Sequence, residues 1–391
     1  MNQIDSSLTL SGDELVLRNA RIVLAGEIIH GSVRLNGETI TDISEGPSSA
    51  PGIDFGGDYL LPGLVDIHTD HFEKHVLPRP HVRWDAMRAA LSHDAQIIGS
   101  GTTTVFDSLA VGSVTKNAER REILTPMIEA LETATRADML KAEHFIHLRC
   151  ELTGEDTPDL IETHLGKDIV RIMSVMEHLP GRRQSRDIES WIHRRMLDAD
   201  ISHKQAEAEL ITLTADFDHI IKAVRPKVVA MAKQHGLPLL SHDDTEPEHI
   251  PEAMADGITI SEFPCTMEAA RLAKQHGMLT VGGAPNVLRG GSQSGNVAVG
   301  DLMHEGLIDI LASDYVPRSM FDAAFMIAAD PQFAEDLPAA VRMVTKAPAW
   351  AAGLTDRGEI AIGLRADLLR VAVHDSYPVL KTVWRQGKRV A

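Results

Sequence analysis

An H-x-D triplet is the first feature of this sequence that could carry chemistry. His68 and Asp70 end the run LLPGLVDIHTD, whose apolar residues predict a buried strand. Residues two apart on a strand point to the same side, so the imidazole and the carboxylate should project together. This pair suits zinc or another divalent transition metal. A surface turn would explain an isolated triplet, but the strand that precedes this one favours a ligand pair.

Further ionisable residues stand at or near the ends of separate predicted strands. They are Glu151, His178, His242, Glu262 and Asp314. A single histidine at a strand end is more often a hydrogen-bonded core residue than a ligand. Two such histidines with several carboxylates on one rim are costly to bury unless they have a role. With the H-x-D triplet they predict a centre for two divalent cations that share a bridging carboxylate and a hydroxide.

Positive charge gathers in loops that should lie over the same rim. The residues are Lys74, Arg79, Arg182, Arg183, Arg186, Arg289 and Arg318. Guanidinium groups bind phosphate oxygens in pairs, and a glycine-rich backbone such as that of NVLRGGSQSGN donates N–H groups to them. Each of these arginines alone could be solvated or paired with an acidic neighbour. Their clustering in loops on one rim favours a polyanionic substrate, and His75 is a further candidate contact.

The elements that must position these residues alternate between strand-like and helical runs. Eight strand candidates end near Asp70, Asp107, Glu151, His178, His242, Glu262, Ala284 and Asp314. Such an order predicts an α/β fold of the (β/α)8 TIM-barrel type, with its site at the carboxyl ends of the strands. The segment 182–236 is too long for one crossover helix. Its helical apolar spacing predicts a helical-hairpin insertion, with a lid or a dimer surface as the alternative.

Both ends of the chain show short alternating apolar runs separated by turn signals. Neither end offers enough strands for a stable sheet, so we expect one composite β-sandwich domain built from both. The predicted limits are 1–60 and 351–391 for the two parts of the β-sandwich, and 61–350 for the barrel.

Composition restricts the functions that need to be considered. The 391 residues carry a formal net charge of −18, which disfavours binding to nucleic acid or to anionic membranes. Two cysteines make a disulfide framework unexpected and suit a reducing compartment. The beginning of the sequence lacks a signal-peptide pattern, and no apolar run is long enough to span a bilayer. We therefore expect a cytoplasmic protein that acts on a small molecule, with a homo-oligomer left open.

Several longer motifs resemble the amidohydrolase superfamily over nearly the whole chain. They include PGLVDIHTD, GTTTV, ASD and a closing G-x-x-A-D-L segment. More narrowly, DIHTDHFEKHVLPRP, MEHLPGRRQ and GAPNVLRGGSQSGN are similar to the phosphonate-metabolism diphosphatases of the carbon–phosphorus lyase pathway. Membership implies hydrolysis of α-D-ribose 1-methylphosphonate 5-triphosphate between its α and β phosphorus atoms. The products would be the 5-phosphate and pyrophosphate.

The resemblance also implies a metal-ligand set. His68, Asp70, Glu151, His178, His242 and Asp314 would hold two divalent metal ions, with zinc favoured and manganese and iron open. The superfamily usually bridges its metals with a carboxylated lysine, but RIMSVMEH contains none, so Glu151 is the expected bridge. The sixth strand supplies Glu262 where the superfamily commonly has histidine. Whether Glu262 or His178 completes the site stays open.

The charges of these residues suggest how protons would be transferred. Asp314 would accept a proton from the attacking water, and His242 or Asp243 would act as a general acid if one is used.

Two other functions remain open on these residues. One is hydrolysis of an amide or cyclic amide, as by a dipeptidase, deacetylase or hydantoinase, and the other is a non-catalytic barrel scaffold.

Overall fold

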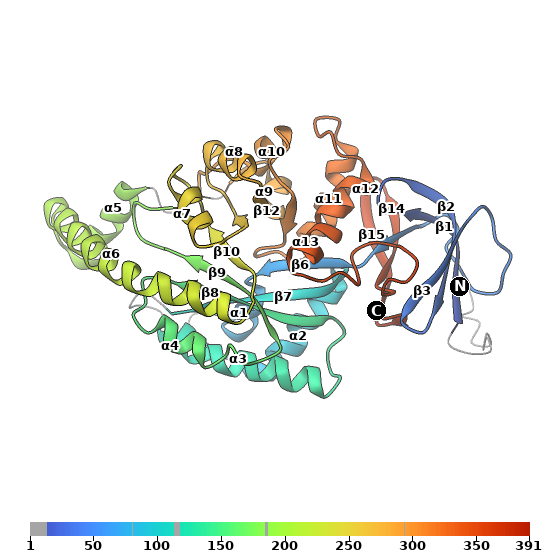
Figure 1. Cartoon of the computed structure of the whole chain (residues 1–391), viewed down its shortest axis with the longest axis horizontal. Helices are drawn as coiled ribbons and strands as arrows, with labels where there is room; N and C mark the ends of the chain where they lie inside the picture. Colours follow the sequence, from blue (N-terminus) through green and yellow to red (C-terminus); the bar gives the residue numbers. More distant parts are fainter. Residues whose placement is uncertain (1–13, 80, 113–117, 184–186, 293) are drawn as a thin grey trace.

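The computed structural model describes residues 14–79, 81–112, 118–183, 187–292 and 294–391. Two sheets organise these residues (Figure 1). One is an eight-stranded parallel sheet in the middle of the chain, and the other combines strands from both ends.

The parallel sheet is the predicted barrel. Its strands follow in chain order as β6 (Leu64–Thr69), β7 (Thr102–Val111), β8 (Glu143–Glu151), β9 (Val170–Met176), β10 (Leu239–His242), β11 (Ile260–Glu262), β12 (Leu279–Gly283) and β13 (Ile310–Ala312). Backbone hydrogen bonds of 3.0 Å from Asp314 N to His68 O and from Asp70 N to Asp314 O join the last strand to the first. The carboxyl ends of the strands therefore meet around one mouth, as the (β/α)8 prediction requires.

Thirteen helices are described. They are α1 (His71–Val76), α2 (Ala86–Gly99), α3 (Ala118–Arg136), α4 (Thr157–Glu162), α5 (Ile188–Ala199), α6 (His203–Gln234), α7 (His249–Ala255), α8 (Met267–Gln275), α9 (Ala284–Arg289), α10 (Val299–His304), α11 (Ser319–Ala329), α12 (Leu337–Met343) and α13 (Lys346–Ala351). The segment predicted as a helical-hairpin insertion contains α5 and α6. The side chain of Ser202 accepts from Gln205 N, and Gln205 accepts from Ser202 N, which forms a capping box at the start of α6.

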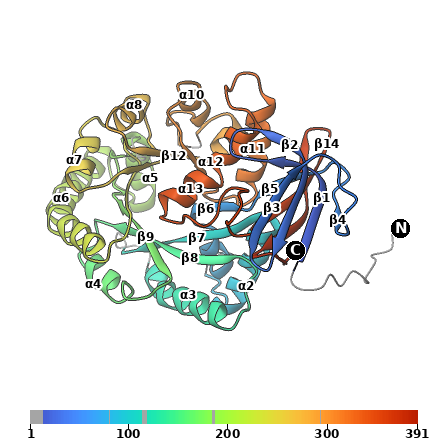
Figure 2. The ribbon, with the colours of Figure 1, turned by 45° about the vertical axis from the view of Figure 1, so that its right-hand side comes forward.

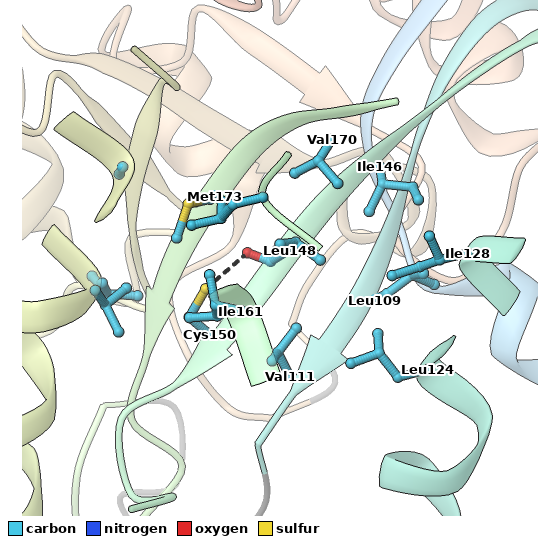
Figure 3. Close-up of a cluster of buried hydrophobic side chains, with 14 of the residues drawn as sticks. Leu109, Val111, Leu124, Ile128, Ile146, Leu148, Cys150, Ile161, Val170 and Met173 are labelled. Atoms are coloured by element: carbon cyan, nitrogen blue, oxygen red, sulfur yellow. Dashed lines mark hydrogen bonds between the residues drawn. The ribbon is translucent and has the colours of Figure 1, made fainter. Parts of the chain in front are cut away.

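Alternation along β8 decides which side chains reach the barrel interior. Ile146, Leu148 and Cys150 pack outward in a buried cluster with Leu124 and Ile128 of α3 (Figure 3). The residues between them must face the opposite side. β8 thus presents a row of polar side chains to the interior.

The interior itself is apolar towards the amino ends of the strands. Buried residues there include Val65, Ile67, Phe106, Leu240 and Ile310. Because Phe106 points inward, the next residue along β7 points to the helix layer. This placement corrects the expectation that the second strand ends near Asp107, since β7 continues to Val111 and Asp107 is buried in mid-strand.

The terminal strands form one mixed sheet, which confirms that both ends of the chain build a single β unit (Figure 2). It contains β1 (Glu14–Val23), β2 (Ile28–Asn36), β3 (Thr39–Glu45), β4 (Ile53–Asp54), β5 (Tyr59–Pro62), β14 (Leu368–His374), β15 (Tyr377–Arg385) and β16 (Lys388–Arg389). Antiparallel pairing of β5 with β14 joins the two ends. Leu17, Phe55, Leu60, Leu368 and Trp384 belong to the core of this unit, which is separate from that of the barrel.

The predicted limits of the domains lie close to these elements and stay a prediction. β5 runs to Pro62 before the barrel begins at Leu64, and α13 ends at Ala351. None of the helices in the described ranges is both long and apolar enough to cross a membrane.

Candidate functional site

A cavity of about 450 Å³ opens at the carboxyl ends of the barrel strands. Its walls carry polar groups of two kinds beside apolar side chains such as that of Phe263. Imidazole and carboxylate groups at the strand ends include those of His68, Asp70, His178, His242 and Asp314, and the surrounding segments add cationic and hydroxyl groups.

Glu262 joins two imidazoles at the floor of this site. Its Oε1 accepts from His68 Nδ1 and its Oε2 from His242 Nδ1, both at 2.6 Å. Burial opposes the charge on Glu262, but His68, His147 and these hydrogen bonds hold its pKa well below the ordinary value. An ionised carboxylate that accepts from Nδ1 leaves the lone pair of each ring on Nε2. The sequence left open whether Glu262 or His178 completes the metal site, and here Glu262 positions two histidines.

His178 and Asp243 lie beside His242 on the cavity wall. Asp243 Oδ2 is 3.5 Å from His242 Nε2 and 3.9 Å from His178 Nε2. This buried oxygen has no hydrogen-bond partner among the described residues. A buried carboxylate oxygen facing two imidazole nitrogens is the donor set of a divalent transition metal. These three residues therefore fit the cation that the sequence predicted.

Glu151 lies behind His178 instead of in the cavity. Its Oε2 accepts from His178 Nδ1 at 2.7 Å, and its Oε1 accepts from Thr153 Oγ1 at 2.9 Å. Because both oxygens are engaged with these neighbours, Glu151 is placed to orient His178. The metal-bridging role expected for Glu151 stays a prediction.

Asp70 and Asp314 face the cavity across the seam that closes the barrel. Asp70 Oδ1 is buried without a hydrogen-bond partner in the described ranges, and Lys74 Nζ lies 3.6 Å away. Burial raises the pKa of Asp314, and the like charge of Asp70 adds to the effect. A carboxylate with a raised pKa is a better proton acceptor than an ordinary aspartate.

The backbone at three strand ends adopts a conformation that side chains other than glycine rarely take. The φ angles of Asp243, Phe263 and Asp314 are 54°, 56° and 54°. Left-handed non-glycine residues cluster at functional sites because the surrounding structure must hold them there. Asp66 supports this region, since its Oδ1 accepts from the backbone N of both His68 and Ser313 at 3.2 Å. Burial raises the pKa of Asp66 to about 6.

Among the residues that the structure describes, three cations line the cavity beside the imidazoles and carboxylates. Lys74 Nζ donates to Tyr315 O at 3.2 Å, and Arg289 Nη1 donates to the Tyr315 hydroxyl at 3.3 Å. The third cation is Arg149, whose Nε contacts Met176 Sδ at 3.2 Å. Beside Arg289, the cavity is lined by Gly291, Ser292, Ser294 and Asn296. This arrangement can bind a group that carries several negative charges.

Of the other predicted arginines, those that the structure describes do not line the cavity. Arg183 is buried, and its guanidinium donates to His242 O at 2.9 Å and to Asp244 Oδ1 at 3.2 Å. Arg182 pairs with Glu177 and with Asp218 of α6.

Two further arginines have neighbours of their own. Arg318 donates to Asp322 Oδ1 and to Pro378 O, and its guanidinium lies over the Phe321 ring. Arg79 is exposed and forms a backbone bridge with Val82. Arg186 lies outside the described residues.

His75 also lies away from the cavity lining, next to His71 and His93.

Two residues of the site were missed by the sequence reasoning. Arg149 could have been found from the alternation of His147, Arg149 and Glu151, which places all three on one face of a strand. Asp66 gave no such signal because its partners are backbone groups.

These features define a barrel enzyme with a site suited to divalent cations. The chain belongs to the amidohydrolase family, whose family model matches residues 59–390. It is 41% identical over 380 residues to the α-D-ribose 1-methylphosphonate 5-triphosphate diphosphatase of Escherichia coli strain K12, covering 96% of this chain and all of that protein. An adenine deaminase of Desulfatibacillum aliphaticivorans is 26% identical over 92% of this chain and 55% of its own length.

Solved structures show the same fold at low sequence identity. A 5-methylcytosine deaminase from Klebsiella pneumoniae, liganded with phosphonocytosine, has a TM-score of 0.64 and 16% identity, covering 96% of this chain and 98% of its own. An N-acetyl-D-glucosamine-6-phosphate deacetylase from Mycobacterium smegmatis has a TM-score of 0.62 and 16% identity, covering 97% of this chain and all of its own. These likenesses support the barrel with its terminal β unit.

Proposed function

We propose that this protein hydrolyses α-D-ribose 1-methylphosphonate 5-triphosphate to the 5-phosphate and pyrophosphate in phosphonate catabolism. The full-length similarity to the Escherichia coli diphosphatase supports this substrate. One observation carries the chemistry: Lys74, Arg149 and Arg289 line the same cavity as the imidazoles and carboxylates of the strand ends. A triphosphate needs both kinds of group, because its charge must be neutralised where its phosphorus atom is attacked.

The residues that would hold divalent cations come from both sides of the cavity. His178, His242 and Asp243 form one group, and His68, Asp70 and Asp314 stand across from it. Bound divalent cations supply Lewis-acid activation of water and neutralise phosphate charge. Imidazole and carboxylate ligands suit zinc, manganese and iron alike, and we favour zinc.

Asp314 serves as the general base of the proposed reaction. Its carboxylate accepts a proton from a water molecule, and the water oxygen forms a bond to the α-phosphorus. The bond from that phosphorus to the oxygen leading to the β-phosphorus breaks, and pyrophosphate departs with the electron pair. The raised pKa of Asp314 suits a group that must take up a proton near neutral pH.

Arg149, Lys74 and Arg289 bind the phosphate oxygens. Their charges stabilise the equatorial oxygens in the transition state and the pyrophosphate as it leaves. Because pyrophosphate is a good leaving group when paired with cations, a strong general acid is not required. His242 and Asp243 are the nearest proton donors if one is used.

The position of bond cleavage can be measured directly. The purified protein is incubated with the triphosphate in water enriched in oxygen-18, and the products are separated and weighed by mass spectrometry. Attack at the α-phosphorus places the label in the 5-phosphate and leaves the pyrophosphate unlabelled. Label in pyrophosphate, or release of inorganic phosphate alone, would contradict the proposed reaction.

Amide hydrolysis remains the second candidate because the family fold supports it and the same imidazoles and carboxylates can serve it. A parallel assay with dipeptides, N-acetylated sugars and hydantoins tests this alternative. Turnover of one of these substrates well above that of the triphosphate would replace the proposal.

A further inference from the structure

Three histidines that take no part in the proposed reaction converge beside the site. His71 and His75 lie one turn apart on α1, and His93 on α2 faces them. The ring centroids are 5.0 Å apart for His71 and His75, 5.8 Å for His71 and His93, and 5.7 Å for His75 and His93. Each of the three offers a ligand nitrogen, and these nitrogens all lie within 4.8 Å of one another.

Each ring also has a buried nitrogen without a partner. Nδ1 of His71, Nε2 of His75 and Nδ1 of His93 find no hydrogen-bond partner in the part of the chain that the structure describes. A buried polar atom without a partner costs free energy, and such atoms are uncommon in folded proteins. Three of them at one place indicate a partner that they share.

Asp107 determines the tautomer of His93, the most deeply buried of the three histidines. Its Oδ1 accepts from His93 Nε2 at 2.6 Å, and its Oδ2 accepts from His144 Nδ1 at 2.7 Å. The hydrogen on His93 is therefore at Nε2, and the lone pair is at the unpartnered Nδ1. A carboxylate bound to the far nitrogen of a histidine is the usual support of a metal-ligating imidazole.

We propose that His71, His75 and His93 bind one divalent cation, with zinc the preferred ion. Three imidazoles are a common ligand set for zinc and leave one position for water or another ligand. His93 is fully buried, whereas His71 and His75 are partly exposed, so the cation would enter from the side of α1. This site shares no residue with the cavity of the proposed reaction, and it does not depend on the identity of the substrate.

A cation in this place would fasten α1 to α2. α1 begins directly after Asp70 and carries Lys74, and both residues line the cavity. The cation would thus hold the segment that delivers a carboxylate and an ammonium group to the substrate. Its removal should loosen binding of the triphosphate, which raises KM more than it lowers kcat.

The test counts zinc in the whole protein. Wild type, His75→Asn and the control His81→Asn are freed of metal with a chelator, loaded with zinc chloride and passed through a desalting column. His81 is an exposed residue of the following loop at φ 63°, where asparagine is well tolerated. We expect His75→Asn to hold one zinc ion fewer per chain than wild type and His81→Asn. The increase in Tm on adding zinc should also be smaller for His75→Asn.

Cobalt distinguishes this site from the cavity. The visible absorption of Co²⁺ bound to nitrogen ligands should lose one component in His75→Asn, and that component should persist in His178→Asn, which alters the cavity. If His75→Asn does not fold, His71→Gln replaces it with the same expectation. Equal zinc counts and equal zinc-dependent changes in Tm for wild type and the folded variant would overturn the proposal.

Discussion

At the scale of single residues, two glutamates decide how the imidazoles of the cavity are presented. Glu262 accepts from His68 and His242, and Glu151 accepts from His178, in each case through Nδ1. All three rings therefore offer Nε2 for binding. A positioning carboxylate typically contributes tenfold to a hundredfold in metal affinity without touching the metal itself.

This arrangement predicts the behaviour of Glu151→Gln. The amide keeps the size of the side chain but loses the charge that holds His178, so we expect metal to bind about 10–100-fold more weakly. The number of metal ions bound per chain should return to the wild-type value when zinc is in excess. Calorimetric titration of zinc into the metal-free protein measures the dissociation constant.

Glu177→Gln is the control because Glu177 neighbours His178 but pairs with Arg182. This variant should retain the wild-type metal affinity. Loss of one ion from Glu151→Gln at every zinc concentration would instead restore the bridging role predicted from the sequence.

Arg183 and Arg289 should have different roles, since the first is packed in the protein and the second is placed to bind substrate. Arg289 is exposed at the cavity, whereas Arg183 is buried against Asp244 and His242 O. Arg289→Ala should lower kcat/KM for the triphosphate by roughly 10–100-fold, the value of a lost charge-assisted contact, with little change in Tm. Arg183→Ala should lower the free energy of unfolding by about 3 kcal/mol because it leaves a buried carboxylate without its cation.

Kinetic assays and urea denaturation of both variants make this comparison. A stable Arg183→Ala with impaired kinetics would show that the guanidinium acts on the substrate after all. An unchanged kcat/KM in Arg289→Ala would place the phosphate groups elsewhere.

At the scale of elements, the sequence predicted the barrel well because its signals are local. An apolar run that ends in an ionisable residue marks the carboxyl end of a strand, and β8, β10 and β11 end at Glu151, His242 and Glu262 as expected. The same local pattern does not reveal which residues of different strands meet. The hydrogen bonds of Glu262 join β11 to β10, through His242 20 residues earlier, and to β6, through His68 194 residues earlier, so the pattern of one strand alone cannot show them.

The loop arginines show a second limit of the sequence. Position after a strand end suggests that a side chain overhangs the barrel mouth, but Asp218, which pairs with Arg182, and Asp244, which pairs with Arg183, lie on elements that the sequence does not place beside them. An arginine near a buried carboxylate forms an ion pair with it, and its guanidinium is then not available to bind substrate. Arg149 was missed for another reason: it stands inside a strand, where only its alternation with His147 and Glu151 indicates that it faces the cavity.

His144 and Asp107 form a buried pair between β7, β8 and α2, and the charge of His144 depends on pH. Burial opposes the charge on His144, but Asp107 and Asp94 raise its pKa to about 9. A raised pKa contributes stability that is fully present below the unfolded value of about 6.5 and is lost as pH rises through 9. Between pH 7.5 and 10 the stability advantage of wild type over His144→Gln should decrease by on the order of 2 kcal/mol.

Urea denaturation of metal-free protein at several pH values measures this difference. The control is His147→Asn, since burial lowers the pKa of His147 to about 3 and the ring is neutral across that range. The difference between wild type and this control should stay constant from pH 7.5 to 10. A constant difference for His144→Gln as well would mean that His144 is neutral in the folded protein.

At the scale of the whole molecule, the two ends of the barrel serve different purposes. The site occupies the carboxyl ends of the strands, and Glu143 stands at the opposite end, where β8 begins. Glu143 pairs there with Arg357 and Arg365, two nearly buried residues of the segment that leads back to the terminal sheet. Arg357 also donates to Thr104 of β7 at 2.9 Å. Residues at this end of a barrel support stability more than catalysis.

Glu143→Gln tests this division between stability and catalysis. The substitution leaves two buried guanidinium groups that still pair with Asp356 and Asp367 but lose the charge of Glu143, so the free energy of unfolding should decrease by about 2 kcal/mol. KM and kcat for the triphosphate should not change, since the cavity lies at the far end of the strands. The exposed pair of Arg83 and Glu122 provides the control Glu122→Gln, which should leave the urea midpoint unchanged. If Glu143→Gln instead raised KM with no change in the urea midpoint, the connection to the terminal sheet would be coupled to the site, and the two ends of the barrel would not be independent.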